Sequence, residues 1–138
     1  RMLRVHADGE GKSYAVAEIF LDRARYDQEP QRYDREMVLS VLEETAGPEL
    51  ATMKQRFTLT AADSRVGQLL GLNPGDPLGR LRRVLLGRDN TIIYFSLTLV
   101  RADRIAFEWV LQRPDQAGTD GNTYSGYLDS ARPGADES

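Results

Sequence analysis

Glu18 is the residue whose place in the sequence most suggests chemistry. It lies in a run of strand formers over residues 14–21, where it shares one face with Tyr14, Val16 and Phe20. If that face is buried, the ionised carboxylate needs a partner or a ligand, because burying an isolated charge is costly. Glu18 is therefore a candidate ligand contact. The alternatives are a structural ion pair with a nearby arginine, or an exposed face.

A second candidate site lies on the strand predicted over residues 91–100. One face of this strand is wholly apolar and predicts core: Ile93, Phe95, Leu97 and Leu99. The other face is mixed: Ile92, Tyr94, Ser96, Thr98 and Val100. A phenol and hydroxyls among apolar groups suit the wall of a ligand pocket. A sheet face covered by a partner subunit would show the same pattern.

Arg4 and His6 share a face of the first predicted strand. Arginine binds anions through paired hydrogen bonds and histidine can donate beside it, so the two could hold an acidic ligand. A frayed, exposed terminal strand is the alternative. Gln55 interrupts an otherwise apolar strand face and is more typical of a satisfied core amide than of a ligand donor.

The sequence lacks the motifs of common enzymes. It has one histidine and no cysteine, so no histidine cluster or thiolate metal site is expected. It has no G-x-S-x-G nucleophile turn, phosphate loop or dinucleotide fingerprint, and we expect neither catalysis nor a cofactor. The net charge of −3 is unlike that of a free-standing nucleic-acid binder. No apolar run approaches the roughly 20 residues of a membrane span. The absence of cysteine suits a reducing cytosol, so we expect a cytoplasmic protein.

Periodicity and turn signals predict the elements that position these residues. Strands are expected over residues 1–6, 14–21, 51–60, 78–86, 91–100 and 104–112, the third of them half-buried. A helix is expected over residues 35–46, capped by Asp34, and a second runs from the Thr60-Ala-Ala-Asp63 cap to Gly71. Residues 22–34 read as a loop. This order favours an α+β fold, an antiparallel sheet with helices on one side.

The composition divides the chain into one domain and a tail. Residues 1–113 have the length and patterning of a single domain, whereas Gly, Pro, Ser, Thr and Asp dominate residues 114–138. Such a segment predicts a flexible tail that the domain does not need for folding. The first residues read as the middle of an element, so we expect a fragment of a longer protein.

Four stretches together resemble one family. They are 61–77 (AADSRVGQLLGLNPGDP), Arg83 in the strand that follows, 100–107 (VRADRIAF) with its R-x-D-R-x-x-F pattern, and 39–47 with its L-E-x-x-x-G end. Their order and spacing resemble the UTRA domain, the effector-binding module of the HutC branch of GntR transcription regulators. The resemblance covers about residues 1–112.

The resemblance implies a chorismate-lyase-like fold with a ligand cavity between sheet and helices. It also implies homodimerisation, a small-molecule effector, and operator DNA read by an upstream winged helix-turn-helix that this chain lacks. The expected site follows from aligned positions: Arg4 and His6 stand for an anion-binding R-x-R segment, Glu18 for a glutamate, and Met37, Leu39, Tyr94 and Val100 for further contacts. Ser96 joins them from the strand pattern. The apolar replacements suggest an effector less polar than a sugar phosphate.

Two other functions fit the same sequence. A chorismate-lyase-like enzyme rests on fold analogy alone. A ligand-free dimerising module, such as an antagonist that forms heterodimers, would lack an enclosed pocket. A cavity with converging polar groups would favour the effector-sensing domain or the enzyme over the ligand-free module. Turnover of chorismate would then favour the enzyme.

Overall fold

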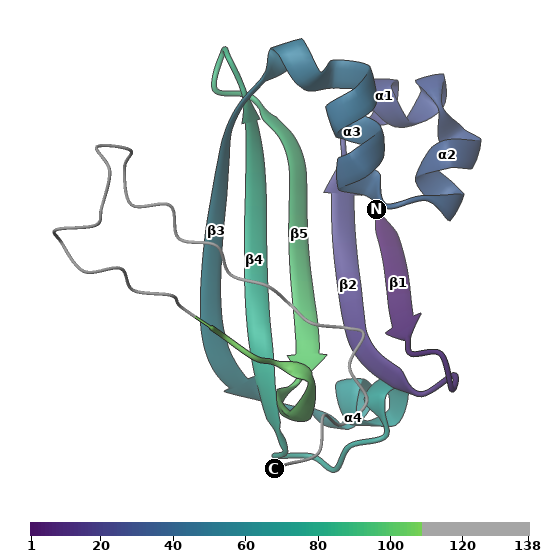
Figure 1. Ribbon diagram of the computed structural model, residues 1–138, viewed down its shortest axis with the longest axis vertical. Coiled ribbons are helices and arrows are strands. Elements are labelled where there is room, and N and C mark those ends of the chain that lie inside the picture. The colour runs from purple at the N-terminus through teal and green to yellow at the C-terminus, as the bar shows by residue number, and fades with distance from the viewer. Residues whose placement is uncertain (109–138) are drawn as a thin grey trace, which may run out of the picture.

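The computed structural model describes residues 1–108, which form a five-stranded antiparallel sheet with four short α-helices (Figure 1). Across the sheet the strands are β1 (Met2–Ala7), β2 (Ser13–Leu21), β5 (Ile92–Arg101), β4 (Pro77–Gly87) and β3 (Leu50–Ala61). The first and last residues of each strand differ by at most one position from those predicted. The predicted α+β class with an antiparallel sheet is confirmed.

Tight turns with specific side-chain bonds join neighbouring strands. In the β1–β2 turn the Asp8 carboxylate accepts hydrogen bonds from the backbone of Glu10 (3.0 Å) and Lys12 (2.9 Å). In the β4–β5 turn Asn90 has a φ of 62°, a left-handed conformation that asparagine tolerates better than most residues. These turns set which residues face each other across the sheet.

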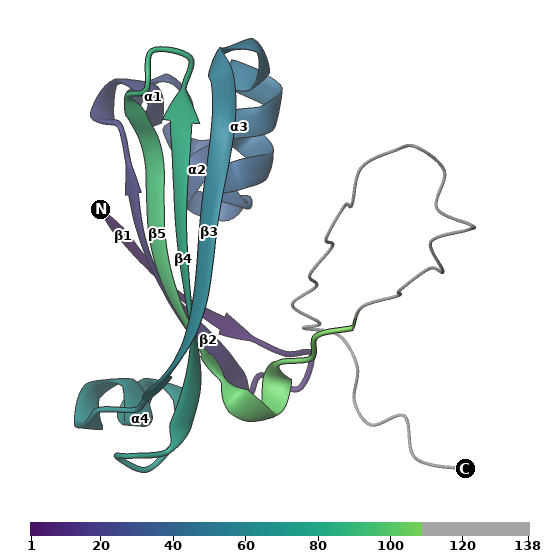
Figure 2. The ribbon, with the colours of Figure 1, turned by 90° about the vertical axis from the view of Figure 1, so that its left-hand side faces the viewer.

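Different helices pack against the two faces of the sheet. We call inner the face that carries Ala17, Ile19 and Tyr94, which pack against helix α3 (Val38–Ala46). We call outer the opposite face, where Val16 and Leu78 pack against helix α4 (Ser64–Leu70). Figure 2 shows α3 and α4 on opposite sides of the twisted sheet. Helices were expected on one side only, and α4 departs from that expectation.

Residues 22–34, expected to form a loop, contain two short helices. They are α1 (Arg23–Gln28) and α2 (Pro30–Arg35). Pro30 stands in the first turn of α2, where its missing N–H is not needed. An Arg23–Asp27 ion pair (2.9 Å) supports α1 at i,i+4 spacing, and Tyr33 is buried against the core. Tertiary packing therefore stabilises helices that are too short to form alone.

Helix α3 begins later than predicted and supplies much of the inner core. Met37 is extended (φ −68°, ψ 120°) and is the residue before the first turn, so Asp34 does not cap this helix. Val41 and Leu42 are fully buried against the sheet. A short 3-10 turn, Gly47–Glu49, then leads into β3.

Helix α4 ends where the sequence predicted but begins later, because Thr60 is still part of β3 and the N-cap is Asp63 rather than Thr60. The Asp63 carboxylate accepts a hydrogen bond from the backbone N–H of Val66 at 2.7 Å, which caps its start. Gly71 ends it with a φ of 64°, in the left-handed conformation that glycine adopts readily.

Strands β3 and β5 are buried differently from the prediction. Strand β3 was expected to be half-buried, but it is the edge strand and even Leu59 is 75% exposed. On β5 the wholly apolar face was expected to be core. Ile93 is buried in the core as predicted, but Phe95, Leu97 and Leu99 are only partly buried on the outer face. Of the mixed face, Tyr94, Ser96 and Val100 are buried on the inner side, whereas Ile92 is 64% exposed.

The chain continues past β5 through a 3-10 turn, Ala102–Arg104. Residues 105–108 form no strand, so the strand predicted over 104–112 is absent as far as residue 108. Here Phe107 packs edge-on against Phe57 of β3, with ring centroids 4.8 Å apart. The rest of that segment and the 114–138 tail lie outside the described residues. Within residues 1–108, no helix is long and apolar enough to cross a membrane.

Candidate functional site

A cavity of about 280 Å³ lies between the inner face of the sheet and the start of α3. Side chains from four strands line it, together with the residues at the beginning of α3 and one arginine that follows β5. The lining residues are Arg4, His6, Tyr14, Ala15, Ala17, Ile19, Met37, Val38, Leu39, Leu81, Arg83, Tyr94, Thr98, Val100 and Arg104. About half of these side chains are apolar and the rest carry hydroxyl, imidazole or guanidinium groups. Polar groups that converge among apolar neighbours are typical of a small-molecule site.

Strand register explains why these residues meet. Arg4 of β1 lies opposite Ala17 of β2, Ala17 lies opposite Thr98 of β5, and Thr98 lies opposite Leu81 of β4. Residues that pair across antiparallel strands point to the same face, so this row spans the inner face of the sheet. The small side chains of Ala15 and Ala17 leave the space that the cavity occupies.

Six of the eight predicted site residues line this cavity: Arg4, His6, Met37, Leu39, Tyr94 and Val100. Ser96 lies on the same inner face between Tyr94 and Thr98, but it is 1% exposed and is not part of the lining. Its Oγ is buried without a hydrogen-bond partner among the described residues. A native structure contains few such groups.

Glu18 lies on the other face of the sheet, so the prediction that it converges with Tyr94, Ser96 and Arg4 is wrong. It pairs with Leu97 across β2–β5, which directs it outward, and its carboxylate forms an ion pair with Arg1. The side chain is 29% exposed in a shallow groove beside α4. The alternative of a structural ion pair with a nearby arginine describes it correctly.

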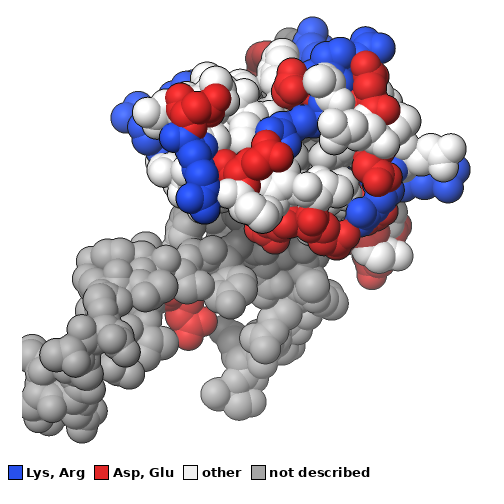
Figure 3. Space-filling view, turned by 90° about the horizontal axis from the view of Figure 1, so that it is seen from above, with Lys and Arg blue, Asp and Glu red and all other residues white. Residues whose placement is uncertain are grey.

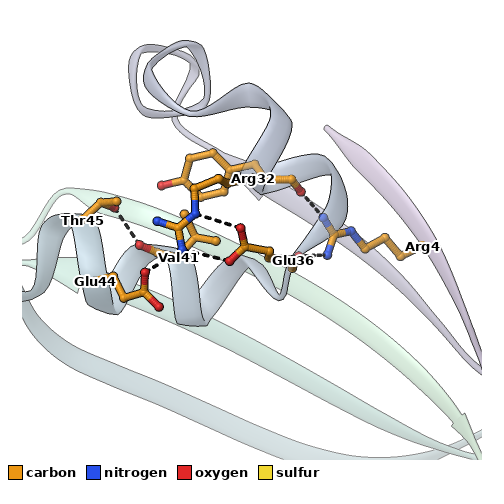
Figure 4. A network of polar contacts seen from close by, with 7 residues as sticks. Arg4, Arg32, Glu36, Val41, Glu44 and Thr45 are labelled. Atoms are coloured by element: carbon orange, nitrogen blue, oxygen red, sulfur yellow. Dashed lines mark hydrogen bonds and ion pairs between the residues drawn. The ribbon is translucent and has the colours of Figure 1, made fainter.

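Hydrogen bonds from Arg4 connect β1 to the C-terminal end of helix α2 (Figure 4). Its guanidinium donates to the carbonyl oxygen of Glu36 at 2.6 Å and to that of Tyr33. Carbonyl groups at a helix C-terminus lack partners within the helix and carry partial negative charge, so a cation binds well there. Arg4 therefore has a structural role beside the cavity.

Arg32 continues this network from α2 to α3. It donates to both carboxylate oxygens of Glu36, at 2.8 and 2.9 Å, and to Glu44 of α3 at 2.6 Å. The bond to Glu36 is the main reason that the pKa of Arg32 is raised, and it lowers the pKa of the Glu36 carboxyl in turn. Arg4 and Arg32 thus connect β1, α2 and α3 through one network of polar contacts (Figure 4).

The surroundings of His6 favour its neutral form. Burial of the ring lowers its pKa from 6.5, and the neighbouring Arg4 charge lowers it further. The ring lies 6.2 Å from that of Tyr14. A neutral imidazole at the cavity can donate or accept one hydrogen bond without adding charge.

Arg83 and Arg104 line the cavity and were absent from the predicted site. Arg83 Nε donates to Gln55 Oε1 at 2.8 Å. Gln55 was expected to be a core amide, but it is exposed on the edge strand, and only its predicted hydrogen bonding is found, at the amide oxygen. Arg104 pairs with Asp8 at 2.6 Å across the β1–β2 turn. The family motifs contain both arginines, but only the register of β4 against β5 reveals that Arg83 points to the inner face.

The helical end of the molecule carries charges of both signs (Figure 3). Arginines there pair with carboxylates, as in Arg25 with Glu49 and Arg32 with Glu44. A nucleic-acid backbone would need a surface of one sign. Within residues 1–108, no group of three or more His, Cys, Asp or Glu residues could hold a metal ion.

Comparison with known proteins places this architecture in a family. The model of the UTRA domain family matches residues 1–106. No curated protein matches the chain.

Solved structures share the fold. The effector-binding domain of the trehalose repressor of Bacillus subtilis is similar over 80% of this chain and 76% of its own, with 14% identity and a TM-score of 0.68. A transcriptional regulator from Streptomyces coelicolor is 25% identical over 81% of this chain and 74% of its own, with a TM-score of 0.66. PhnF from Mycobacterium smegmatis is 25% identical over 75% of this chain and 46% of its own, with a TM-score of 0.60.

Proposed function

Because the chain belongs to the UTRA domain family, we propose that it is the effector-sensing and dimerising domain of a GntR-type, HutC-branch transcription regulator. The observation that carries this proposal is the cavity between α3 and the inner face. Its position between sheet and helices is the one that the family resemblance implied. The regulators with a similar fold support the same function.

The lining favours binding over catalysis. No carboxylate is among the lining residues of the described chain, and His6 is the only imidazole there. General acid–base chemistry commonly uses a histidine or carboxylates positioned at the reacting group. The cavity instead offers hydroxyls and cations on an apolar floor, which suit recognition of a small molecule.

Helix α3 is the element that would carry the signal. Met37, Val38 and Leu39 line the cavity, and Arg32 connects the following turns of α3 to α2. An effector that binds one position of α3 better than another shifts the balance between them. A coupling of about 1–3 kcal/mol is typical of such regulation. Operator DNA would be read in the cytoplasm by a winged helix-turn-helix outside this chain.

Dimerisation would use the outer face. Leu3, Val5 and Phe20 lie there at 50%, 45% and 41% exposure, beside the partly buried Leu97 and Leu99. Glu18 lies between Leu3 and Leu97 and pairs with Arg1. Exposed apolar side chains gathered around polar groups in this way are typical of an interaction surface. A two-fold contact brings the same patch of each subunit together, so this surface could pair with itself.

A melting experiment tests the proposed cavity. We expect one member of a panel of cell metabolites to raise the melting temperature of the wild-type chain. Ala15→Leu places a larger side chain on the cavity floor, so this variant should not respond to that metabolite. Thr58→Leu on the outer face of β3 is the matched control and should respond as the wild type does. Equal responses of all three proteins would contradict ligand binding in this cavity.

A further inference from the structure

Arg83 is the lining arginine whose charge the described chain leaves uncompensated. Arg104 forms an ion pair with Asp8, and Arg4 donates to the two carbonyl oxygens at the end of α2. Arg83 uses its Nε for the Gln55 amide oxygen, and no carboxylate of residues 1–108 forms an ion pair with its guanidinium. Its two terminal nitrogens thus remain available toward the cavity.

The position of Arg83 is fixed by its neighbours on both sides. Across β3–β4 it lies directly opposite Gln55, and across β4–β5 it lies directly opposite Ser96. Tyr94 and Thr98 flank Ser96 on the same face of β5 and line the cavity. Tyr94, Thr98 and Arg83 therefore line the cavity on neighbouring strands, with the buried Ser96 between the two hydroxyl residues and outside the lining.

Ser96 is a second, independent sign that a polar partner belongs here. Its side chain is almost fully buried, and its Oγ has no hydrogen-bond partner in the described chain. A hydroxyl in this condition loses the hydrogen bonds that water gave it in the unfolded chain. Ser96 lies directly opposite Arg83, so a ligand oxygen at Arg83 would lie beside this residue, although Ser96 is not itself part of the lining.

The chemistry of the guanidinium identifies the class of partner. With Nε held by Gln55, the planar group can present both terminal nitrogens to two oxygens of one acidic group. Such paired bonds favour carboxylates and phosphates over neutral acceptors. A partly buried cation beside an apolar wall is stabilised by an anion more than it would be in water.

We propose that Arg83, oriented by Gln55, binds an acidic group of the effector and makes this cavity selective for anionic over neutral ligands. The acidic group is a carboxylate or a phosphate. This inference rests on the proposed function, because it assigns a ligand chemistry to the same cavity.

A pair of fluorescent dyes tests the selectivity. Anilinonaphthalene sulfonate and phenylnaphthylamine share one ring system, and only the first carries an acidic group. We expect the wild-type chain to bind the sulfonate more tightly than the neutral dye. Arg83→Gln should weaken the sulfonate by roughly tenfold or more, the usual loss for a charged hydrogen-bonding group. Binding of the neutral dye should change by less than about twofold.

Two further variants isolate the role of Arg83. Arg82→Gln removes a neighbouring charge from the outer face, where the guanidinium lies over the Phe95 ring at 5.4 Å, and should leave both affinities unchanged. Gln55→Leu should weaken the sulfonate by a smaller factor of roughly threefold, because Arg83 keeps its charge but loses its orientation. Equal loss in Arg82→Gln and Arg83→Gln would overturn the proposal in favour of general surface attraction.

The outcomes also separate this inference from the proposed function. If both dyes bind equally well and Arg83→Gln changes neither affinity, ligand binding in the cavity is supported but selectivity for anions is contradicted. If neither dye binds the wild-type chain, the cavity and the inference both fail. Melting curves show whether each variant is folded. Should Arg83→Gln not fold, Arg83→Lys replaces it, because lysine keeps the positive charge but lacks the two paired terminal nitrogens of arginine. If Arg83→Lys and Gln55→Leu both keep the wild-type preference for the sulfonate, the orienting role of Gln55 is overturned.

Discussion

Arg4 of β1 donates a 2.6 Å hydrogen bond to the backbone carbonyl of Glu36, the residue that follows helix α2. The two residues are far apart in the sequence, and the bond ties the first strand to the segment that enters α3. Since α2 is only six residues long, contacts of this kind are what keep it folded.

Arg4→Met should therefore destabilise the chain. The substitution retains an apolar stem and removes a charged donor from two carbonyl groups, which should lower the free energy of unfolding by about 1–3 kcal/mol. Urea denaturation measures this change. Arg35→Met, at an exposed position of α2, is the control and should change it by less than about 0.5 kcal/mol. Equal effects of both substitutions would show that the Arg4 bonds add nothing.

The single histidine provides a direct measurement of the electrostatics at the cavity. Burial and then the Arg4 charge lower the pKa of His6 below 6.5 in the folded chain. The unfolded chain consequently binds the proton more tightly. The stability that His6 contributes is present above pH 6.5 and is lost as the pH falls from there through the folded pKa.

An NMR titration of His6 should show a midpoint below 6.5. In Arg4→Met the midpoint should rise but should not fully recover, because burial is the larger cause. A midpoint at or above 6.5 in the wild-type chain would contradict the burial of this ring.

Ser96→Ala should not harm folding. Its Oγ is buried without a hydrogen-bond partner in the described chain. Removing the hydroxyl therefore removes the free-energy cost of burying an unpaired polar group. We expect the free energy of unfolding to stay the same or to rise by up to about 1 kcal/mol. A loss of more than about 1 kcal/mol in thermal or urea unfolding would indicate that the hydroxyl has a structural partner.

The outer face should control self-association. Val5→Glu places a charge in the apolar patch formed with Leu3 and Phe20, and like charges would meet across a two-fold contact. Light scattering at tens of micromolar should give a dimer for the wild-type chain and a monomer for the variant. Leu59→Glu, on the inner face of the β3 edge, is the control and should remain dimeric. A monomeric wild-type chain would contradict the proposed interface.

The sequence predicted the strands well because each is encoded locally. Alternating side chains and turn residues such as Asp8-Gly9 define where a strand begins and ends without reference to its neighbours. The α4 helix follows the same logic, since Asp63 and Gly71 carry both of its ends.

Helices α1 and α2 could not be predicted in this way. They lack an apolar stripe, and they depend on contacts such as Arg4 with Tyr33 and Glu36, which join distant parts of the chain. The position of β3 at the edge of the sheet could not be predicted from the sequence for a similar reason. Alternation shows that a strand has two different faces, but not whether another element covers either of them.

Register explains the outcome for the candidate site. Alternation grouped Glu18 with Val16 and Tyr94 with Ser96, and both groupings are correct. Whether the two groups share a face depends on which residue of β5 lies opposite Glu18. That residue is Leu97, so Glu18 lies on the outer face, away from the cavity. The separate pairing of Arg83 with Ser96 across β4–β5 brings Arg83 to the inner face.

Native mass spectrometry tests the central claim, that a small molecule binds between α3 and the inner face, most directly. The wild-type chain and Ala15→Leu would each be incubated with a cell-metabolite extract, desalted and measured. The account predicts that the wild-type chain carries a small-molecule adduct that Ala15→Leu, with its occupied cavity floor, does not retain. An adduct of the same mass on both proteins, or none on the wild-type chain, would contradict it.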